Sequence, residues 1–386
     1  MSSEAFVDKM KGIQNSLLEF LEDESDEESK YDNIINLVSS QQIINTKYEF
    51  KSLLQLISRI GNNHQRSPNF ISKIERLLRH FKPNIQEYFS NSEIFQIFED
   101  NKRILLILIE EKIMIIDEHI FSILTSFPYH EYFYCDYFKP ELKPFFTIEN
   151  IKKYRNKNEI LINEKFIERM NEAVDESFYD KRREGENDDY LCQLIRLDKI
   201  KEFVQFVSQT NLSLESQIKK SIFETNKLLI DYSFKLKLID YTLFFGSIKI
   251  IQYLIEKTKN VSSELWIYSI HTNDSKMINL LENYQIKPDT QKVLEESIKC
   301  HHNEISSYII DNLIKEEGIR NNIENKYYDN LYRYAVESYN YCFFPTNMKY
   351  KNLFFYLCEF DYYTLVKLFL SEFNIDINAR IKTLII

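Results

Sequence analysis

The sequence predicts an all-α protein in which an N-terminal helical region precedes a solenoid of stacked helix–turn–helix pairs. Glycine is scarce, with five residues in 386 where average usage gives about 27, and β-hairpins and bulges depend on glycine for positive φ. Apolar residues recur at intervals of three and four along most of the chain, which is typical of amphipathic helices. In the second half, similar segments follow one another with turns 27 and 28 residues apart, and this period predicts an array of helical repeats.

Composition excludes several classes of protein. No two glycines lie closer than 49 residues, so the chain has no glycine-rich loop of the kind that cradles a phosphate or a dinucleotide. The net charge of −10 argues against nucleic acid as a partner, because that affinity comes from clustered Lys and Arg. The longest apolar run, Ile104–Ile109, is far shorter than the about 20 residues that cross a bilayer. We therefore expect no cofactor, no nucleic acid and no membrane association.

The predicted location is the cytoplasm. The first residues lack the apolar core of a signal peptide. The five cysteines are odd in number and widely spaced, without a C-x-x-C motif, which favours reduced intracellular thiols over a disulfide framework.

Residues 1–30 are expected to form an amphipathic helix and an acidic loop. The stretch 21–29 carries too many acidic residues to pack, and we interpret it as solvated. An alternative is a phosphorylation site at Ser25, since the acidic residues that follow suit a kinase with a basic pocket. The apolar residues of the helix share one face: Phe6, Met10, Ile13, Leu17 and Phe20.

Residues 31–178 are expected to form a divergent helical domain. One predicted helix covers residues 50–60 and ends at Gly61, where a C-terminal cap belongs. Another is expected to begin at Pro68, with Ser67 as its N-cap, and to end at Pro83, because proline lacks the N–H that continues a helix.

The same region contains one further helix pair and an irregular segment. A short helix at 92–98 and a longer one at 102–112 are separated by a polar turn. Residues 127–146 contain three prolines among many aromatic residues and are expected to form a packed irregular connection. The polar stretch 180–189 is interpreted as an exposed linker between the two halves of the chain.

Residues 190–386 are expected to form the repeats. The clearest unit is Tyr241–Ile255, with its turn at Gly246, and the next unit has Asn273 in the corresponding position. One helix pair is too small to bury its apolar stripe alone, so neighbouring pairs must cover it. Turns are expected near residues 198, 246, 273, 301, 339 and 361.

These segments resemble the helix–turn–helix half of an ankyrin repeat, most closely in Leu243–Gly246 and Ile250–Leu254. The closing segment Phe373–Ala379 is similar to the asparagine-rich turn after the second helix of that family. The resemblance implies degenerate ankyrin-like repeats after an N-terminal helical domain, as in a group of protist ankyrin-repeat proteins whose N-terminal domain has no known function. The runs that resemble this group are Tyr190–Arg196, Leu294–Ile298 and Tyr341–Phe344.

The chain also departs from the ankyrin pattern. Lys237–Asp240 replaces the family's Thr-Pro-Leu-His motif. Asn, His or Asp occupies most of the turn positions at which the family has glycine. A spacing below the family's usual length of about 33 residues implies trimmed or missing β-hairpins.

Two motifs approach known metal sites. His130-Glu131 begins a metalloprotease-like motif, but Tyr134 stands at the position where the second histidine is required. Cys300-His301-His302 offers three potential ligands in a row, but adjacent residues of a helix point about 100° apart and cannot converge on one ion without distortion. We therefore expect no metal site, and a structural or surface role for these three residues.

The predicted function is non-catalytic binding of a protein partner, as a scaffold or adaptor. A rigid concave surface of stacked helix pairs binds with little ordering cost, and the solvent-facing positions of the first helices would make the contacts. The negative net charge favours partners with basic segments, and Trp266 is expected in the core. The alternative is an enzyme, or a regulatory subunit of one, with a site in the N-terminal helical domain around His130 and Cys135.

Overall fold

All regular structure in the described part of the chain is helical. The structure, a computed structural model, describes residues 1–23, 25, 27–64, 69–126, 134–147, 164–230, 235–258, 261–314, 324–345, 348 and 352–373. Within these residues the one β-type contact is an isolated antiparallel bridge between Gln217 and Lys237. The prediction of an all-α protein is therefore confirmed.

The chain forms two compact units that are not simply consecutive in sequence. The first unit combines residues 1–70 with residues 259–386, and the second unit comprises residues 71–258. The expected ranges 1–30, 31–178 and 190–386 stay a prediction, and the contacts divide the chain at other residues.

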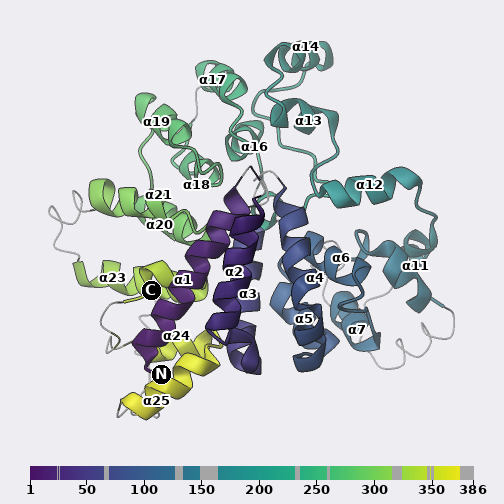
Figure 1. Ribbon diagram of the computed structural model, residues 1–386. Helices are drawn as coiled ribbons and strands as arrows, with labels where there is room; N and C mark the ends of the chain where they lie inside the picture. Colours follow the sequence, from purple (N-terminus) through teal and green to yellow (C-terminus); the bar gives the residue numbers. More distant parts are fainter. Residues whose placement is uncertain are drawn as a thin grey trace. The chain divides into compact units, whose positions relative to one another are not determined.

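Pairs of short helices recur in both units (Figure 1). In each pair a first helix of six to ten residues is followed, after a few residues, by a second helix of six to eleven. The pairs of the second unit are α5 (Asn91–Phe98) with α6 (Lys102–Glu110), α13 (Tyr190–Arg196) with α14 (Ile200–Thr210), and α16 (Leu238–Phe244) with α17 (Ile248–Lys257). The pairs of the first unit are α18 (Leu265–Ile270) with α19 (Ser275–Asn283), α20 (Thr290–Lys299) with α21 (Asn303–Tyr308), and α24 (Leu353–Glu359) with α25 (Tyr363–Glu372).

A left-handed residue stands at each expected turn of residues 190–386. The amide of the next residue closes a backbone hydrogen bond five residues back in several turns, from Ser247 to Thr242 (3.1 Å) and from Asn340 to Ala335 (2.9 Å), for example. This is the Schellman pattern that ends helices. It holds the turn geometry although only one of these residues is glycine. The residues and their φ angles are Asp198 (48°), Gly246 (64°), Asn273 (48°), His301 (57°), Tyr339 (57°) and Asp361 (61°).

Three helices open the first unit: α1 (Ser3–Glu22), α2 (Glu28–Ser40) and α3 (Lys47–Asn63). The hydroxyls of Ser2 and Thr46 cap α1 and α3 by accepting backbone N–H bonds. The apolar face expected for residues 6–20 is confirmed, since Phe6, Met10, Ile13 and Leu17 are all fully buried.

Helix α1 lies along the C-terminal helices of the same unit, beside α25 in Figure 1. Its contacts run in reverse order along the chain. The Asn273 amide donates to Glu22 (3.3 Å), the Gln14 amide donates to Asn340 (2.8 Å), and the Ser3 backbone N–H donates to Glu372 (2.7 Å). One end of α1 therefore contacts the turn of the α18–α19 pair, and the other end contacts α25.

Helix α3 makes a second row of contacts, with the turns near residues 301 and 361. The Asn63 amide donates to the Lys299 carbonyl (2.9 Å), and Lys51 forms an ion pair with Asp361. At the start of the helix, the Tyr48 ring stacks on Tyr363 with 3.7 Å between ring centroids. Helices α1 and α3 thus hold together turns that are far apart in the sequence.

In the second unit, α4 (Phe70–Tyr88) runs through Pro83, so the predicted helix end at this proline is wrong. Pro83 removes one intrahelical bond. The turn that follows it is nevertheless retained, because it buries Ile85 completely and Phe89 to 6 % exposure. The other helices among the described residues of this unit are α7 (Glu118–Ser126), α9 (Lys139–Leu142), the 3-10 helix η3 (Lys143–Phe145), α11 (Glu164–Asn171), α12 (Glu176–Glu184) and α15 (Lys227–Ile230).

The interpretation of residues 180–189 as an exposed linker is also wrong. Helix α12 continues to Glu184, and Arg182 and Asn187 are only 2 % and 3 % exposed. The Arg182 guanidinium donates two hydrogen bonds to Glu141, at 2.7 and 3.0 Å. The charge of Arg182 can be buried because it is paired with Glu141. The sequence alone does not show that these two residues are partners.

Candidate functional site

The four histidines of the first unit are buried, each at most 4 % exposed. His64 follows the last residue of α3, and His271 follows α18. His301 and His302 form the turn between α20 and α21. A buried imidazole needs a partner for its ring nitrogens, and three of these side chains, those of His64, His271 and His302, form two groups with acidic and sulfur side chains.

The first group is His271, Glu296 and Cys300. His271 Nε2 lies 2.8 Å from a Glu296 carboxylate oxygen. The Cys300 sulfur lies 3.7 Å from both ring nitrogens of His271, so it is not directed at the lone pair of either one. Burial raises the pKa of the Cys300 thiol well above its usual value. Burial also raises the pKa of Glu296, but the contact with His271 outweighs this and lowers it overall. In this group a histidine–carboxylate contact lies beside a neutral thiol.

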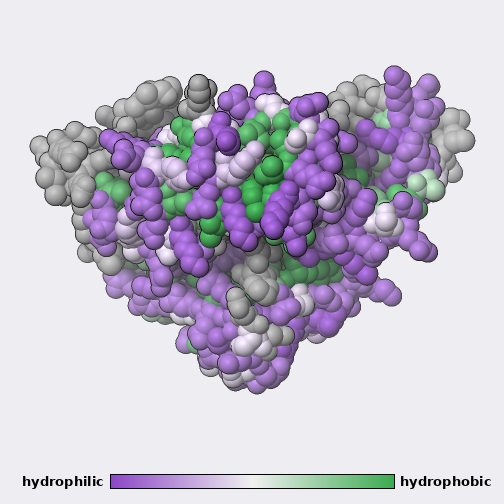
Figure 2. Space-filling model, turned by 90° about the horizontal axis from the view of Figure 1, so that it is seen from above, coloured by the Kyte–Doolittle hydropathy of each residue, from purple (hydrophilic) through white to green (hydrophobic). Residues whose placement is uncertain are grey.

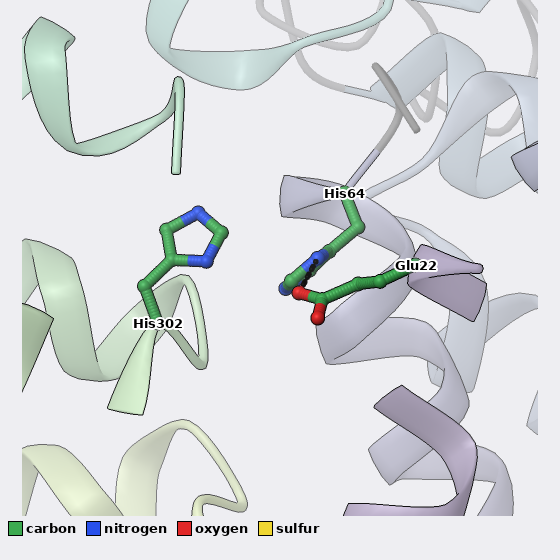
Figure 3. Close-up of side chains that lie close together, drawn as sticks. All are labelled: Glu22, His64 and His302. Atoms are coloured by element: carbon green, nitrogen blue, oxygen red, sulfur yellow. Dashed lines mark ion pairs between the residues drawn. The ribbon is translucent and has the colours of Figure 1, made fainter. Parts of the chain in front are cut away.

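The second group is Glu22, His64 and His302 (Figure 3). His64 Nδ1 lies 3.1 Å from Glu22 Oε1, and the rings of His64 and His302 lie 4.7 Å apart at an angle of 65°. The three atoms able to bind a metal lie within 4.8 Å of one another. Figure 3 shows the His302 ring facing the His64–Glu22 pair from the opposite side.

The hydrogen bonds of His64 determine which nitrogen carries a proton. Nε2 lies 2.6 Å from the Cys300 carbonyl oxygen, which can only accept, so Nε2–H is the donor. In a neutral ring, Nδ1 then presents a lone pair to the Glu22 carboxylate, and two lone pairs repel. A cation between them, either a proton or a metal ion, is needed to make this contact favourable.

His302 lacks the bonds that a buried imidazole normally makes. Among the described residues, neither of its ring nitrogens has a hydrogen-bond partner, although the side chain is only 4 % exposed. Burial, together with the other histidines, lowers the pKa of His302 well below its usual value, so the ring is neutral. An unpaired buried polar group costs about 1–3 kcal/mol. The second group is therefore polar, enclosed and incompletely satisfied.

The spacing of Cys300-His301-His302 predicts that the three side chains do not converge on one point, and in the structure they do not form one group. Cys300 joins His271, while His302 faces His64. Sequence reasoning missed Glu22 and His64, which lie 280 and 238 residues before His302. Each stands at the end of an amphipathic helix, and that position is the one sequence signal that could have indicated them.

A further set of buried ionisable groups lies in the second unit. Burial raises the pKa of Glu224 to about 7 and lowers the pKa of Lys102 to about 7. Glu224 accepts backbone N–H bonds from Asn187 (3.3 Å), Thr225 (3.0 Å) and Asn226 (3.1 Å). Because these bonds occupy both carboxylate oxygens, we interpret Glu224 as fixing the loop that precedes α15.

The alternative enzyme site was expected around His130 and Cys135. His130 lies outside the described residues. Cys135 is fully buried, and its sulfur lies 3.6 Å from the Leu124 carbonyl oxygen, to which it donates. A thiol in this position is not exposed to a substrate from solvent.

No protein-family model, curated protein or solved structure matches the sequence. Among the described residues, no helix is both long enough and apolar enough to cross a membrane.

Proposed function

We propose that the chain is a non-catalytic scaffold that binds another protein through an ankyrin-like array of helix pairs. The observation that carries this proposal is the exposed face of α13, the first helix of its pair. Tyr190 and Leu197 are 55 % and 66 % exposed, whereas the opposite side of the helix is buried. The two residues lie seven positions apart, or about two helical turns, with exposed Gln193 between them on the same face.

The face has the properties of a contact surface. Tyrosine is enriched where proteins bind tightly, because its ring buries much area and its hydroxyl remains polar. The Tyr190 ring packs against Phe206 of α14 with 5.6 Å between centroids, so it is held in position before a partner arrives. A side chain that is already ordered loses less entropy on binding.

Two of the other first helices, α16 and α18, offer less exposed surface. Every residue of α16 except Asp240 is buried. Trp266 in α18 is fully buried, and its indole N–H donates to the Ile286 carbonyl at 2.8 Å, which confirms the expected core role. On the face drawn in Figure 2, hydrophobic side chains reach the surface in bands between hydrophilic ones. These features support α13 as the place to test.

The test uses a photo-crosslinking amino acid at Gln193 of the full chain, exposed to cell extract. We expect one reproducible protein adduct, and we expect it to be lost in the double variant Y190A/L197A. The matched control is Y284A/L370A, which also removes an exposed tyrosine (37 %) and an exposed leucine (49 %). The proposal fails if no adduct forms, or if the control reduces the adduct as much as Y190A/L197A does.

A further inference from the structure

We propose that Glu22, His64 and His302 bind a divalent transition-metal ion, for which Zn²⁺ is the best match. The site lies inside the first unit, where the last residue of α1, the residue after α3 and the turn between α20 and α21 meet. It is independent of the proposed partner surface on α13.

The ligand set is one that zinc takes in proteins. Two imidazole nitrogens and one carboxylate oxygen bind Zn²⁺ at about 2.0–2.2 Å, which places neighbouring ligand atoms about 3.3 Å apart in a tetrahedral site. His64 Nδ1 and Glu22 Oε1 already lie 3.1 Å apart, and all three ligand atoms lie within 4.8 Å. A side-chain movement of about 1 Å thus completes the geometry. A water molecule would take the fourth position.

The outer contacts also match those of a metal site. A metal-bound histidine usually donates its other ring N–H to a carbonyl or a carboxylate, which fixes the nitrogen that faces the metal. His64 donates from Nε2 to the Cys300 carbonyl at 2.6 Å, which leaves Nδ1 for the ion. The Glu22 carboxylate is oriented in a similar way, because it accepts a hydrogen bond from the Asn273 amide at 3.3 Å.

A bound ion would account for two features of the site. It would supply a partner to His302, whose ring nitrogens have none among the described residues although the side chain is 96 % buried (4 % exposed). It would also take the position between the lone pair of His64 Nδ1 and the Glu22 carboxylate, where a proton is the alternative cation. Glu22 is 37 % exposed at its side chain, so an ion can reach the site from solvent and displace little structure.

The neighbouring group His271–Glu296–Cys300 is the less suitable of the two. Its imidazole and carboxylate already satisfy one another at 2.8 Å, and its sulfur is not directed at a ring nitrogen lone pair. Zinc would have to break this histidine–carboxylate contact and remove a proton from a buried thiol. We therefore place the ion at Glu22, His64 and His302 alone.

The experiment uses full-length protein stripped of metal with a chelator. Zinc chloride is titrated against a chromogenic zinc indicator, and the melting temperature is measured with and without zinc at about 100 times the apparent Kd. We expect one zinc ion per chain and a melting temperature that rises by several degrees. With cobalt(II) in place of zinc, visible absorption bands should report a tetrahedral N/O site.

The variants E22Q and H302Q should weaken zinc binding at least about 100-fold, which is more than the loss of a residue that only contacts a ligand would cause. Both variants should also abolish the zinc-dependent rise in melting temperature. H119Q removes an exposed histidine of the second unit and should bind zinc like the wild type. E22Q changes one partly exposed atom, so it should fold even if H302Q does not. The proposal is overturned if the wild type takes up no zinc, or if E22Q binds zinc as tightly as H119Q.

Discussion

Replacing Gln14 by leucine should destabilise the first unit strongly. Gln14 is a completely buried residue of α1, and both ends of its amide are used. Its carbonyl oxygen accepts the Tyr341 backbone N–H at 2.7 Å, and its NH₂ group donates to Asn340 Oδ1 at 2.8 Å. The Asn340 amide in turn donates to the Ile298 carbonyl at 3.1 Å and to Asn303 at 2.9 Å. Gln14 thus connects α1 to a buried polar network.

The size of the effect follows from the groups left without partners. Leucine nearly fills the volume of glutamine, so the cavity contribution is small, but the Tyr341 N–H loses its acceptor. Asn340 Oδ1 keeps only a weaker contact with the Cys342 N–H at 3.3 Å. A buried donor or acceptor without a partner costs about 1–3 kcal/mol, so the free energy of unfolding should fall by about 2–4 kcal/mol. A unit of this size then melts roughly 5–15 °C lower.

Urea denaturation of the full chain, monitored by circular dichroism, measures the change in the free energy of unfolding. Thermal melting of the same protein measures the change in melting temperature. The control is Q205L, because Gln205 is an exposed residue in the middle of α14. Equal stability of Q14L and Q205L, within about 0.5 kcal/mol, would refute the inference that this buried network stabilises the first unit.

Three further changes can be measured on the same instruments. Since burial raises the pKa of Glu224 from 4.5 to about 7, the folded state keeps a proton that the unfolded state loses between these pH values. This contribution to stability should therefore decline by about 3 kcal/mol as the pH rises from 4.5 to 7, and E224Q should flatten the decline in urea titrations. G185A should cost at least about 1–2 kcal/mol, because φ is +70° and a Cβ would meet Arg103 Cδ at 2.9 Å. G12A should instead stabilise by about 0.5–1 kcal/mol, since Gly12 lies inside α1 with no atom within 4 Å of an added Cβ.

Local features of the fold could be predicted from the sequence because they depend on nearby residues. The apolar spacing of residues 6–20 identifies a helix and its buried face, and the polar interruptions near Gly246 and Asp361 identify turns. These turns use backbone bonds within the same helix end, so the pattern persists when asparagine, histidine or aspartate replaces glycine.

The structural features that the sequence predicts wrongly depend on contacts with residues far away in the chain. A proline normally ends a helix, but the burial of Ile85 retains the turn after Pro83. The charges of residues 180–189 suggest exposure, yet Arg182 is buried against Glu141, 41 residues away. The candidate metal site illustrates the same limit, because Glu22 and His64 meet His302 only once α1 and α3 contact the turns near the other end of the chain.

The contacts of α1 and α3 with residues 273–372 can form only late during synthesis on the ribosome. Both helices pair with residues 273–372, and the whole second unit is synthesised between them and their partners. At about 5–20 residues per second, the 350 residues between Glu22 and Glu372 delay those contacts by roughly 20–70 s. During this interval α1 can already contact α2 and α3, but the contacts of α1 and α3 with residues 273–372 are missing. Both helices thus complete their native contacts only after the second unit has been synthesised.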